Sequence, residues 1–192
     1  VHFAISEITT EQIVDGLDKR ELDIGIVSIP LQIDNLVEIA LYDEPFLLFD
    51  KTDDTPRDDF QIDEIDYDRL WLLEEGHCMR TQVESICGLQ KKRTADRNLD
   101  YRSGSIDSLL KFVNRNRGTT LLPYLATRDF TDTNRQHLKQ FGTPVPSRTI
   151  GLLVHEHFVK KEILDALKKA IQDKVRPLLE ETNAHRMVVA PT

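Results

Sequence analysis

The fold of this chain is best predicted from one run, Leu22-Asp23-Ile24-Gly25-Ile26-Val27-Ser28-Ile29, which is mostly apolar and β-branched. Such a run is typical of a strand in a sheet that is covered on both faces. Upstream, residues 2–6 alternate like a short strand. Thr9 or Thr10 can cap the helix that follows, and Gln12 completes a capping-box pattern with Thr9. Strand, helix and strand together predict a β-α-β unit with parallel strands.

Further strands and helices alternate along the rest of the chain. We predict strands at 71–73, 119–122 and 148–154, helices at 78–87 and 105–115, a long amphipathic helix that follows the last strand, includes Ile163 and runs to Pro177, and a frayed tail beyond Glu181. Two extended runs, 36–41 and 46–49, flank the turn-like 42–45, where we place a hinge. The alternation predicts an α/β fold with doubly wound sheets and helices on both faces.

The late strand and long helix indicate that the first lobe is completed by the end of the chain. We therefore expect two lobes with a cleft between them. Residues 1–42 form the first part of one lobe, residues 43–146 form the second lobe, and residues 147–192 return to the first.

Composition excludes several classes of protein. The formal net charge of -8 argues against nucleic-acid binding by this part of the chain, because phosphate contacts need clustered Lys and Arg. Apolar runs stay well below the roughly 18 residues that would span a bilayer. The chain begins at Val1 without a basic-then-apolar leader, so we expect a piece of a longer cytoplasmic protein.

The two cysteines, Cys78 and Cys87, are the one chemical focus of the sequence. They could be ordinary buried thiols, metal ligands or a redox pair. On a continuous helix, nine residues correspond to about 13.5 Å of rise and place the two positions on opposite faces. A disulfide needs its Cα atoms within about 7 Å. If both exist, the helix and the bond exclude each other, and the redox state would select the conformation.

The two thiols differ in their predicted surroundings. Cys78 stands at a helix start, where free amide N–H groups and the positive end of the dipole favour the thiolate. Arg80 adds positive potential, whereas Glu74 and Glu75 act in the opposite direction. Cys87 lies beside apolar residues and suits a resolving role. A thiolate attacked by peroxide becomes a sulfenic acid, which a second thiol converts to a disulfide.

Metal binding has less support. His77 and the two cysteines do not form a tight ligand cluster, and the sequence contains no Cys-x-x-Cys. The two histidines in His155-Glu156-His157 fit an exposed strand end. We assign no metal and no cofactor.

The segment Gly76-His77-Cys78-Met79-Arg80, followed by Gln82 and Cys87, closely resembles the sensing segment of the peroxide-responsive LysR-type transcription regulators. Three other segments resemble the same family: 7–10, 118–123 and 148–152. The resemblance implies a two-lobed LysR effector domain that is similar to periplasmic binding proteins.

The same resemblance implies roles for five residues. Cys78 would be the peroxidatic thiol and Cys87 the resolving thiol, while Thr10, His77 and Arg148 would position hydrogen peroxide. The last three also have structural interpretations: Thr10 as a helix cap, His77 in a turn hydrogen bond, and Arg148 in an ion pair.

Partners follow from the resemblance as well. It implies a homodimer or homotetramer, DNA binding through a winged-helix domain N-terminal to this chain, contact with RNA polymerase, and a thiol reductant such as glutaredoxin or thioredoxin. Such a domain is a switch and not a turnover enzyme. Two alternatives stay open: a thiol peroxidase that uses the same cysteines, and a LysR-type effector domain that binds a small organic molecule in the cleft.

Overall fold

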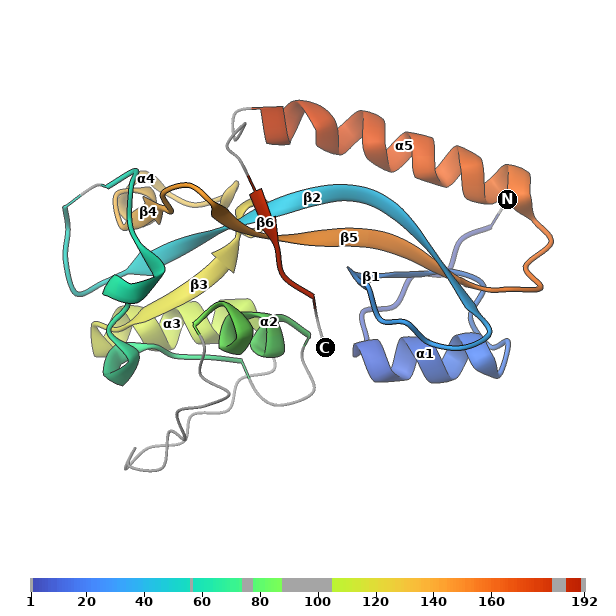
Figure 1. Cartoon of the computed structure of the whole chain (residues 1–192), viewed down its shortest axis with the longest axis horizontal. Coiled ribbons are helices and arrows are strands. Elements are labelled where there is room, and N and C mark those ends of the chain that lie inside the picture. Colours follow the sequence, from blue (N-terminus) through green and yellow to red (C-terminus); the bar gives the residue numbers. More distant parts are fainter. Residues whose placement is uncertain (1, 56, 74–77, 88–104, 181–185, 191–192) are drawn as a thin grey trace.

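The computed structural model describes residues 2–55, 57–73, 78–87, 105–180 and 186–190, and shows an elongated molecule with helices above and below long strands (Figure 1). Its elements are α1 (Thr10–Asp18), β1 (Gly25–Ile29), β2 (Leu36–Asp50), η1 (Ile62–Glu64), η2 (Tyr67–Arg69), α2 (Cys78–Ile86), α3 (Ile106–Asn116), β3 (Thr119–Pro123), η4 (Tyr124–Thr127), α4 (Asp132–Arg135), β4 (Leu138–Gln140), β5 (Val145–His155), α5 (Lys161–Leu179) and β6 (Arg186–Val188).

Lobe I is built around β5, which lies between β1 and the first part of β2. Because successive side chains of a strand point to opposite faces of the sheet, β5 contributes residues to two apolar clusters. Leu152 packs in the cluster that includes Leu164 of α5, and Leu153 packs in the cluster that includes Leu17 of α1. Helices therefore cover both faces of this sheet, as predicted.

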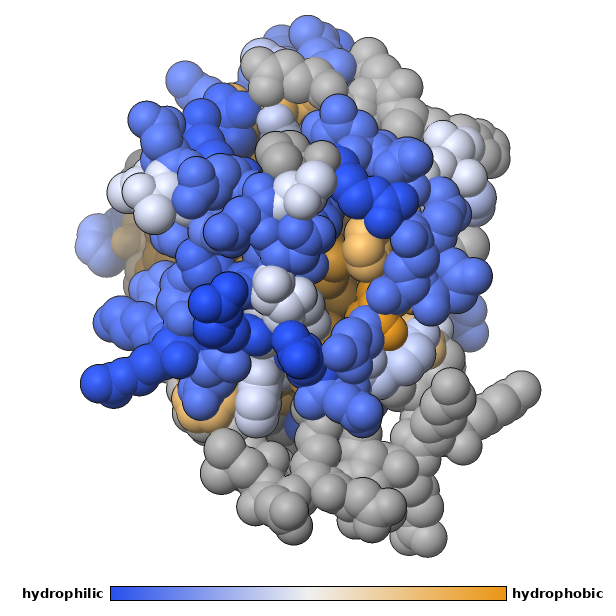
Figure 2. Space-filling model, turned by 90° about the vertical axis from the view of Figure 1, so that its left-hand side faces the viewer, coloured by the Kyte–Doolittle hydropathy of each residue, from blue (hydrophilic) through white to orange (hydrophobic). Residues whose placement is uncertain are grey.

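Lobe II uses the second part of β2, residues 46–50, which pairs with β3 and β4. Its core joins this sheet to α2 and α3 through Phe46, Phe49, Val83 and Leu109, all of them buried. The end of this lobe is mainly hydrophilic, with apolar side chains visible in a central strip and in a few smaller spots (Figure 2). The two-lobed α/β fold is thus confirmed. The residue division 1–42, 43–146 and 147–192 stays a prediction, although β2 changes its partners after Pro45.

The predicted parallel β-α-β unit is wrong. Residues 2–6 are not a strand, and β1 pairs with β5 in antiparallel fashion. The reason is topological, because a strand that arrives late in the chain inserts between β1 and β2. Among the named strands described, the parallel pair is β5 with β6, so the tail predicted to fray forms a strand at 186–188.

Three local predictions also need correction. Residues 42–45 do not turn: they continue β2 and pair with β5, after a bulge between Ala40 and Tyr42. Residues 71–73 form no strand, since pairing there is a single bridge from Leu70 to Thr119. Helix α5 passes Pro177 and ends at Leu179, so that the missing proline N–H affects only its last turn.

The helix predicted after Thr9 or Thr10 corresponds to α1, and the helices predicted at 78–87 and 105–115 correspond to α2 and α3. The strands predicted at 119–122 and 148–154 correspond to β3 and β5. Within the described ranges, none of the helices is both long and apolar enough to cross a membrane.

Candidate functional site

A hollow of about 300 Å³ lies where α1 meets β1, β2 and β5. Two residues predicted for the peroxide site, Thr10 and Arg148, both line it. Its lining consists of Ile8, Thr9, Thr10, Ile13, Ile26, Val27, Ser28, Tyr42, Arg148 and Ile150. The structure therefore brings together side chains that are far apart in the sequence.

The start of α1 assigns the capping role to Thr9. The Oγ1 atom of Thr9 accepts a hydrogen bond from the Gln12 N–H at 3.3 Å, and the Thr9 N–H donates to Gln12 Oε1 at 3.0 Å. This is the capping box expected from the sequence. Thr10 is the first helical residue, and its hydroxyl has no hydrogen bond to another described residue. The hydroxyl is therefore available to a ligand in the hollow.

Arg148 is held by a buried carboxylate. Its Nε and Nη2 atoms donate to Glu44 Oε2 at 2.9 and 2.8 Å, and Glu44 is only 1% exposed. The other oxygen, Glu44 Oε1, accepts from the Leu125 N–H at 2.8 Å. The ring of Phe46 lies 5.9 Å from the guanidinium carbon. This pairing fixes the arginine and leaves its Nη1 without a hydrogen bond to any described residue.

A second buried side chain connects the hollow to α2. Gln82 is fully buried, and its Nε2 atom donates to the Oγ of Ser28, which lines the hollow, at 3.2 Å. Its Oε1 has no hydrogen-bond partner among the described residues. On an α-helix, residues four apart share one face, so position 78 lies one turn before Gln82 on the same face. The helix that begins at Cys78 is therefore linked to the wall of the hollow.

Cys87 is a free thiol, 7% exposed, within the core of lobe II. Burial raises the pKa of this thiol to about 12, so that it stays protonated at neutral pH. Its backbone N–H donates to the Val83 carbonyl at 2.9 Å. Helical hydrogen bonding thus continues from Cys78 through Cys87.

His77 and the side chain of Cys78 lie outside the described residues, and so does the predicted helix end at Gly88. Sequence reasoning assigned no role to Glu44, Ser28 or Gln82. One signal could have found Gln82, because it is a polar residue between the buried positions Met79, Val83 and Ile86 of the same helix.

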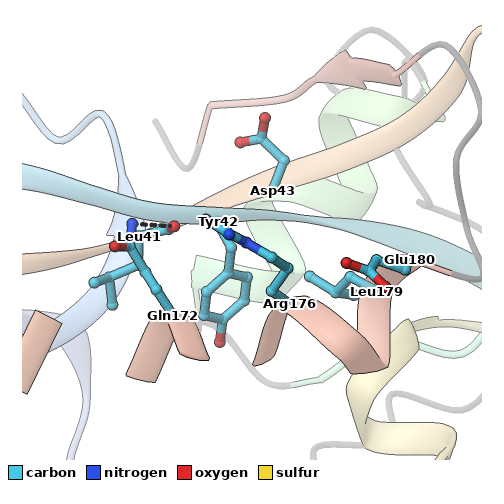
Figure 3. Close-up of a pocket in the computed structure, with 7 residues that line it drawn as sticks. All are labelled: Leu41, Tyr42, Asp43, Gln172, Arg176, Leu179 and Glu180. Atoms are coloured by element: carbon cyan, nitrogen blue, oxygen red, sulfur yellow. Dashed lines mark hydrogen bonds between the residues drawn. The ribbon is translucent and has the colours of Figure 1, made fainter. Parts of the chain in front are cut away.

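A smaller hollow of about 200 Å³ lies between β2 and the end of α5. Figure 3 shows the ring of Tyr42 pointing toward α5 between Gln172 and Arg176, while Asp43 points the other way. Gln172 Nε2 donates to the Leu41 carbonyl at 2.9 Å. Burial, reinforced by the nearby Glu44 carboxylate, raises the pKa of the Tyr42 hydroxyl. The described residues include no group of three or more His, Cys, Asp or Glu side chains that could hold a metal ion.

Two α/β lobes that share the long strand β2, with a small hollow between α1, β1, β2 and β5 of lobe I, define the class of two-lobed α/β domains. The chain belongs to the LysR substrate binding domain family, which it matches over residues 1–176. The resemblance inferred from the sequence is confirmed at this level.

Known relatives are regulators. A probable hydrogen peroxide-inducible genes activator of Streptomyces viridosporus is 28% identical over 182 residues, covering 91% of this chain and 56% of the relative. The HTH-type transcriptional regulator EstR of Acinetobacter baylyi is 29% identical over 182 residues, covering 88% of this chain and 57% of the relative. The crystal structure of OxyR from Porphyromonas gingivalis superposes with a TM-score of 0.83 and 25% identity, covering 97% of this chain and 84% of that chain. The chain thus spans somewhat more than half the length of these curated relatives.

Proposed function

We propose that this chain is the peroxide-sensing regulatory domain of a LysR-type transcription regulator, in which Cys78 is oxidised and then trapped by Cys87. One observation carries the proposal: the helix that starts at Cys78 continues without a break to Cys87, which is a buried free thiol. The relatives named for peroxide-inducible genes and for OxyR support the same function.

The chemistry requires only the two thiols and hydrogen peroxide. The Cys78 thiolate attacks one peroxide oxygen, the O–O bond breaks, and the products are a sulfenic acid and hydroxide, which takes up a proton to become water. The Cys87 thiol then displaces the sulfenic hydroxyl as a second water. In total, two thiols and one H₂O₂ give one disulfide and two H₂O, with sulfur oxidised and peroxide reduced.

Helix geometry makes this bond a conformational switch. Nine residues of α-helix separate the two Cα atoms by about 13.5 Å, whereas a disulfide requires less than about 7 Å. Forming the bond therefore requires part of α2 to unwind, because the helix begins at Cys78 and Cys87 is packed in the core of lobe II. A bond available to only one conformer shifts the population toward that conformer.

Thr10, Arg148 and His77 complete the proposed site. Thr10 and Arg148 both line the hollow, and the Thr10 hydroxyl and the Arg148 Nη1, neither bonded to another described residue, are donors that could serve peroxide oxygens. A fixed positive charge stabilises the hydroxide that leaves when the O–O bond breaks. His77 keeps its proposed role by resemblance alone.

Intact-protein mass spectrometry after brief treatment with hydrogen peroxide tests the proposal. Wild type should lose two mass units and retain no alkylatable thiol. Cys78→Ser should keep Cys87 reduced, whereas Cys87→Ser should accumulate a sulfenic acid at Cys78 that dimedone labels. If wild type keeps both thiols while a control thiol protein oxidises, the proposed function is wrong.

The rate of oxidation tests the hollow. Arg148→Ala and Thr10→Val should each slow oxidation of Cys78 by about tenfold or more, because each removes a donor to the transition state. Arg176→Ala is the matched control, since Arg176 lines the smaller hollow beside α5. Equal rates in Arg148→Ala and Arg176→Ala would remove Arg148 from the site.

For the whole protein, we propose a non-enzymatic activator that acts as a homodimer or homotetramer in the cytoplasm. It would bind DNA through an N-terminal winged-helix domain, contact RNA polymerase, and be reduced by a glutaredoxin or thioredoxin. Gel-shift assays on the full-length protein, reduced and oxidised, would show whether DNA binding changes with the disulfide.

A second function is favoured by the size of the hollow. About 300 Å³ with several apolar side chains is room for a small organic molecule as well as for peroxide. In that case the cysteines are incidental, and a Cys78→Ser, Cys87→Ser double variant responds normally in cells. Loss of the response in the double variant argues for the redox switch.

A further inference from the structure

Gln82 contacts two parts of the molecule that are far from α2 in the sequence. Its Nε2 atom donates to Ser28 Oγ on β1 and also to the backbone carbonyl of Val189, each at 3.2 Å. Gln82 is fully buried, and its Oε1 has no partner within the described residues. A buried amide with one unsatisfied oxygen is a costly way to fill a core position. Its hydrogen bonds to Ser28 and Val189 therefore point to a coupling role.

Strand β6 and Val189 attach to the rest of the molecule through a short strand pairing and one buried side chain. Strand β6 pairs with only three residues of β5, Val145 to Ser147, and the Val189 N–H donates to the Ser147 carbonyl at 2.7 Å. The Val189 side chain packs in the core of lobe II, the same core that contains Cys87. A strand of three residues whose neighbour among the described strands is a single parallel one has few ladder hydrogen bonds and is expected to open more easily than the central strands. Removing the bond from Gln82 therefore weakens a marginal element.

Gln82 lies in the middle of the segment that joins the two cysteines, four residues after Cys78 and five before Cys87. Closing about 13.5 Å of helix to less than 7 Å moves the residues between the two ends. The Gln82 amide then cannot keep both Ser28 and Val189 as partners. Cys87 and Val189 also pack in the same core, so any movement of Cys87 would disturb the packing of Val189.

We infer that β6 and Val189 form a redox-responsive C-terminal element, held in the reduced protein by Gln82 and loosened when the Cys78–Cys87 disulfide forms. The inference rests on the proposed function and extends it to a second part of the molecule. Figure 1 shows how the chain leaves β6 and descends toward the lobe that contains α2. Oxidation would thus change the surface at the chain end as well as the sensing segment.

Amide hydrogen exchange measured by NMR on the whole chain tests this coupling. Oxidation with one equivalent of peroxide should lower the protection of the Val189 N–H by about tenfold or more, while the Leu153 N–H in the centre of lobe I changes little. Mass spectrometry of the same samples reports the disulfide. A disulfide with unchanged Val189 protection overturns the inference and leaves the proposed function intact. Absence of the disulfide overturns both.

A variant identifies the link. In the reduced protein, Gln82→Leu should lower Val189 protection without any oxidation. Gln172→Leu is the matched control, because Gln172 also donates from a helix to a backbone carbonyl but does so between α5 and β2. Equal protection of Val189 in wild type and in Gln82→Leu would show that Gln82 is not the link. The oxidised wild-type measurement decides the coupling even if Gln82→Leu does not fold.

Discussion

Replacing Arg148 by Met leaves the Glu44 carboxylate buried without its counter-ion. Glu44 is 1% exposed and would keep one of its three hydrogen bonds, the one from the Leu125 N–H. Breaking a buried ion pair by removing one partner costs about 3–5 kcal/mol, because the remaining charge has no compensation. We therefore expect Arg148→Met to lower the free energy of unfolding by about that amount.

Urea denaturation of the reduced protein, followed by circular dichroism, measures this loss. With an m-value of about 2–3 kcal/mol per molar urea, the midpoint should fall by about 1–2.5 M. The double variant Glu44→Gln, Arg148→Met should recover about 1–2 kcal/mol of the loss. In that variant the buried group is neutral, while the Leu125 N–H keeps an oxygen acceptor.

The control is Arg57→Met, which breaks an ion pair with Glu64 at the surface. Solvent and salt screen that pair, so the urea midpoint should change little. The reasoning is refuted if Arg148→Met also shifts the midpoint by less than about 0.3 M. It is equally refuted if the double variant is less stable than Arg148→Met alone, since an uncompensated charge would then not be the cause.

Two further predictions concern stability. Burial raises the pKa of the Cys87 thiol to about 12, against an ordinary value of 9.0, so its contribution to the free energy of unfolding is complete below pH 9 and is lost as the pH rises through 12. Between pH 8 and pH 10 the free energy of unfolding of wild type should therefore fall by about 1 kcal/mol more than that of Cys87→Ala. Urea titrations at the two pH values under reducing conditions measure this difference. Gly118→Ala would place a Cβ against the indole Nε1 of Trp71, and it should lower the free energy of unfolding by about 1–3 kcal/mol and shift the Trp71 fluorescence spectrum. An unshifted spectrum and unchanged stability would contradict the close contact.

The local structure was predictable where the sequence carries a local signal. The capping box at Thr9 and Gln12, the apolar stripe of α3 and the β-branched runs depend on neighbours only a few residues away. The direction of the strands could not be predicted in this way, because it depends on which distant segment pairs with β1. Residues 42–45 contain a proline and two acids, and they looked like a turn. Glu44 instead points inward to Arg148, and that long-range pair keeps the strand extended.

The site was predictable only in part, and for the same reason. Thr10 and Arg148 were assigned to one site by resemblance, and the fold places both on one hollow. Ser28 and Gln82 meet across 54 residues of sequence, so neither residue shows its role until the lobes are assembled. Cys87 was expected to lie among apolar residues, and its burial agrees with that expectation.

Two buried polar side chains cross between the lobes, and together they explain how events at the hollow can reach lobe II. Glu44 binds Arg148 on one side and the Leu125 N–H of η4 on the other, while Gln82 joins α2 to Ser28. Both groups are fully enclosed, so neither bond can be replaced by water without opening the core. A change in the helix that carries the cysteines must therefore either break the Gln82 bonds or move β1 with it. In both cases the contact between α2 and β1 changes, and under the proposed function a disulfide between residues 78 and 87 would bring about that change.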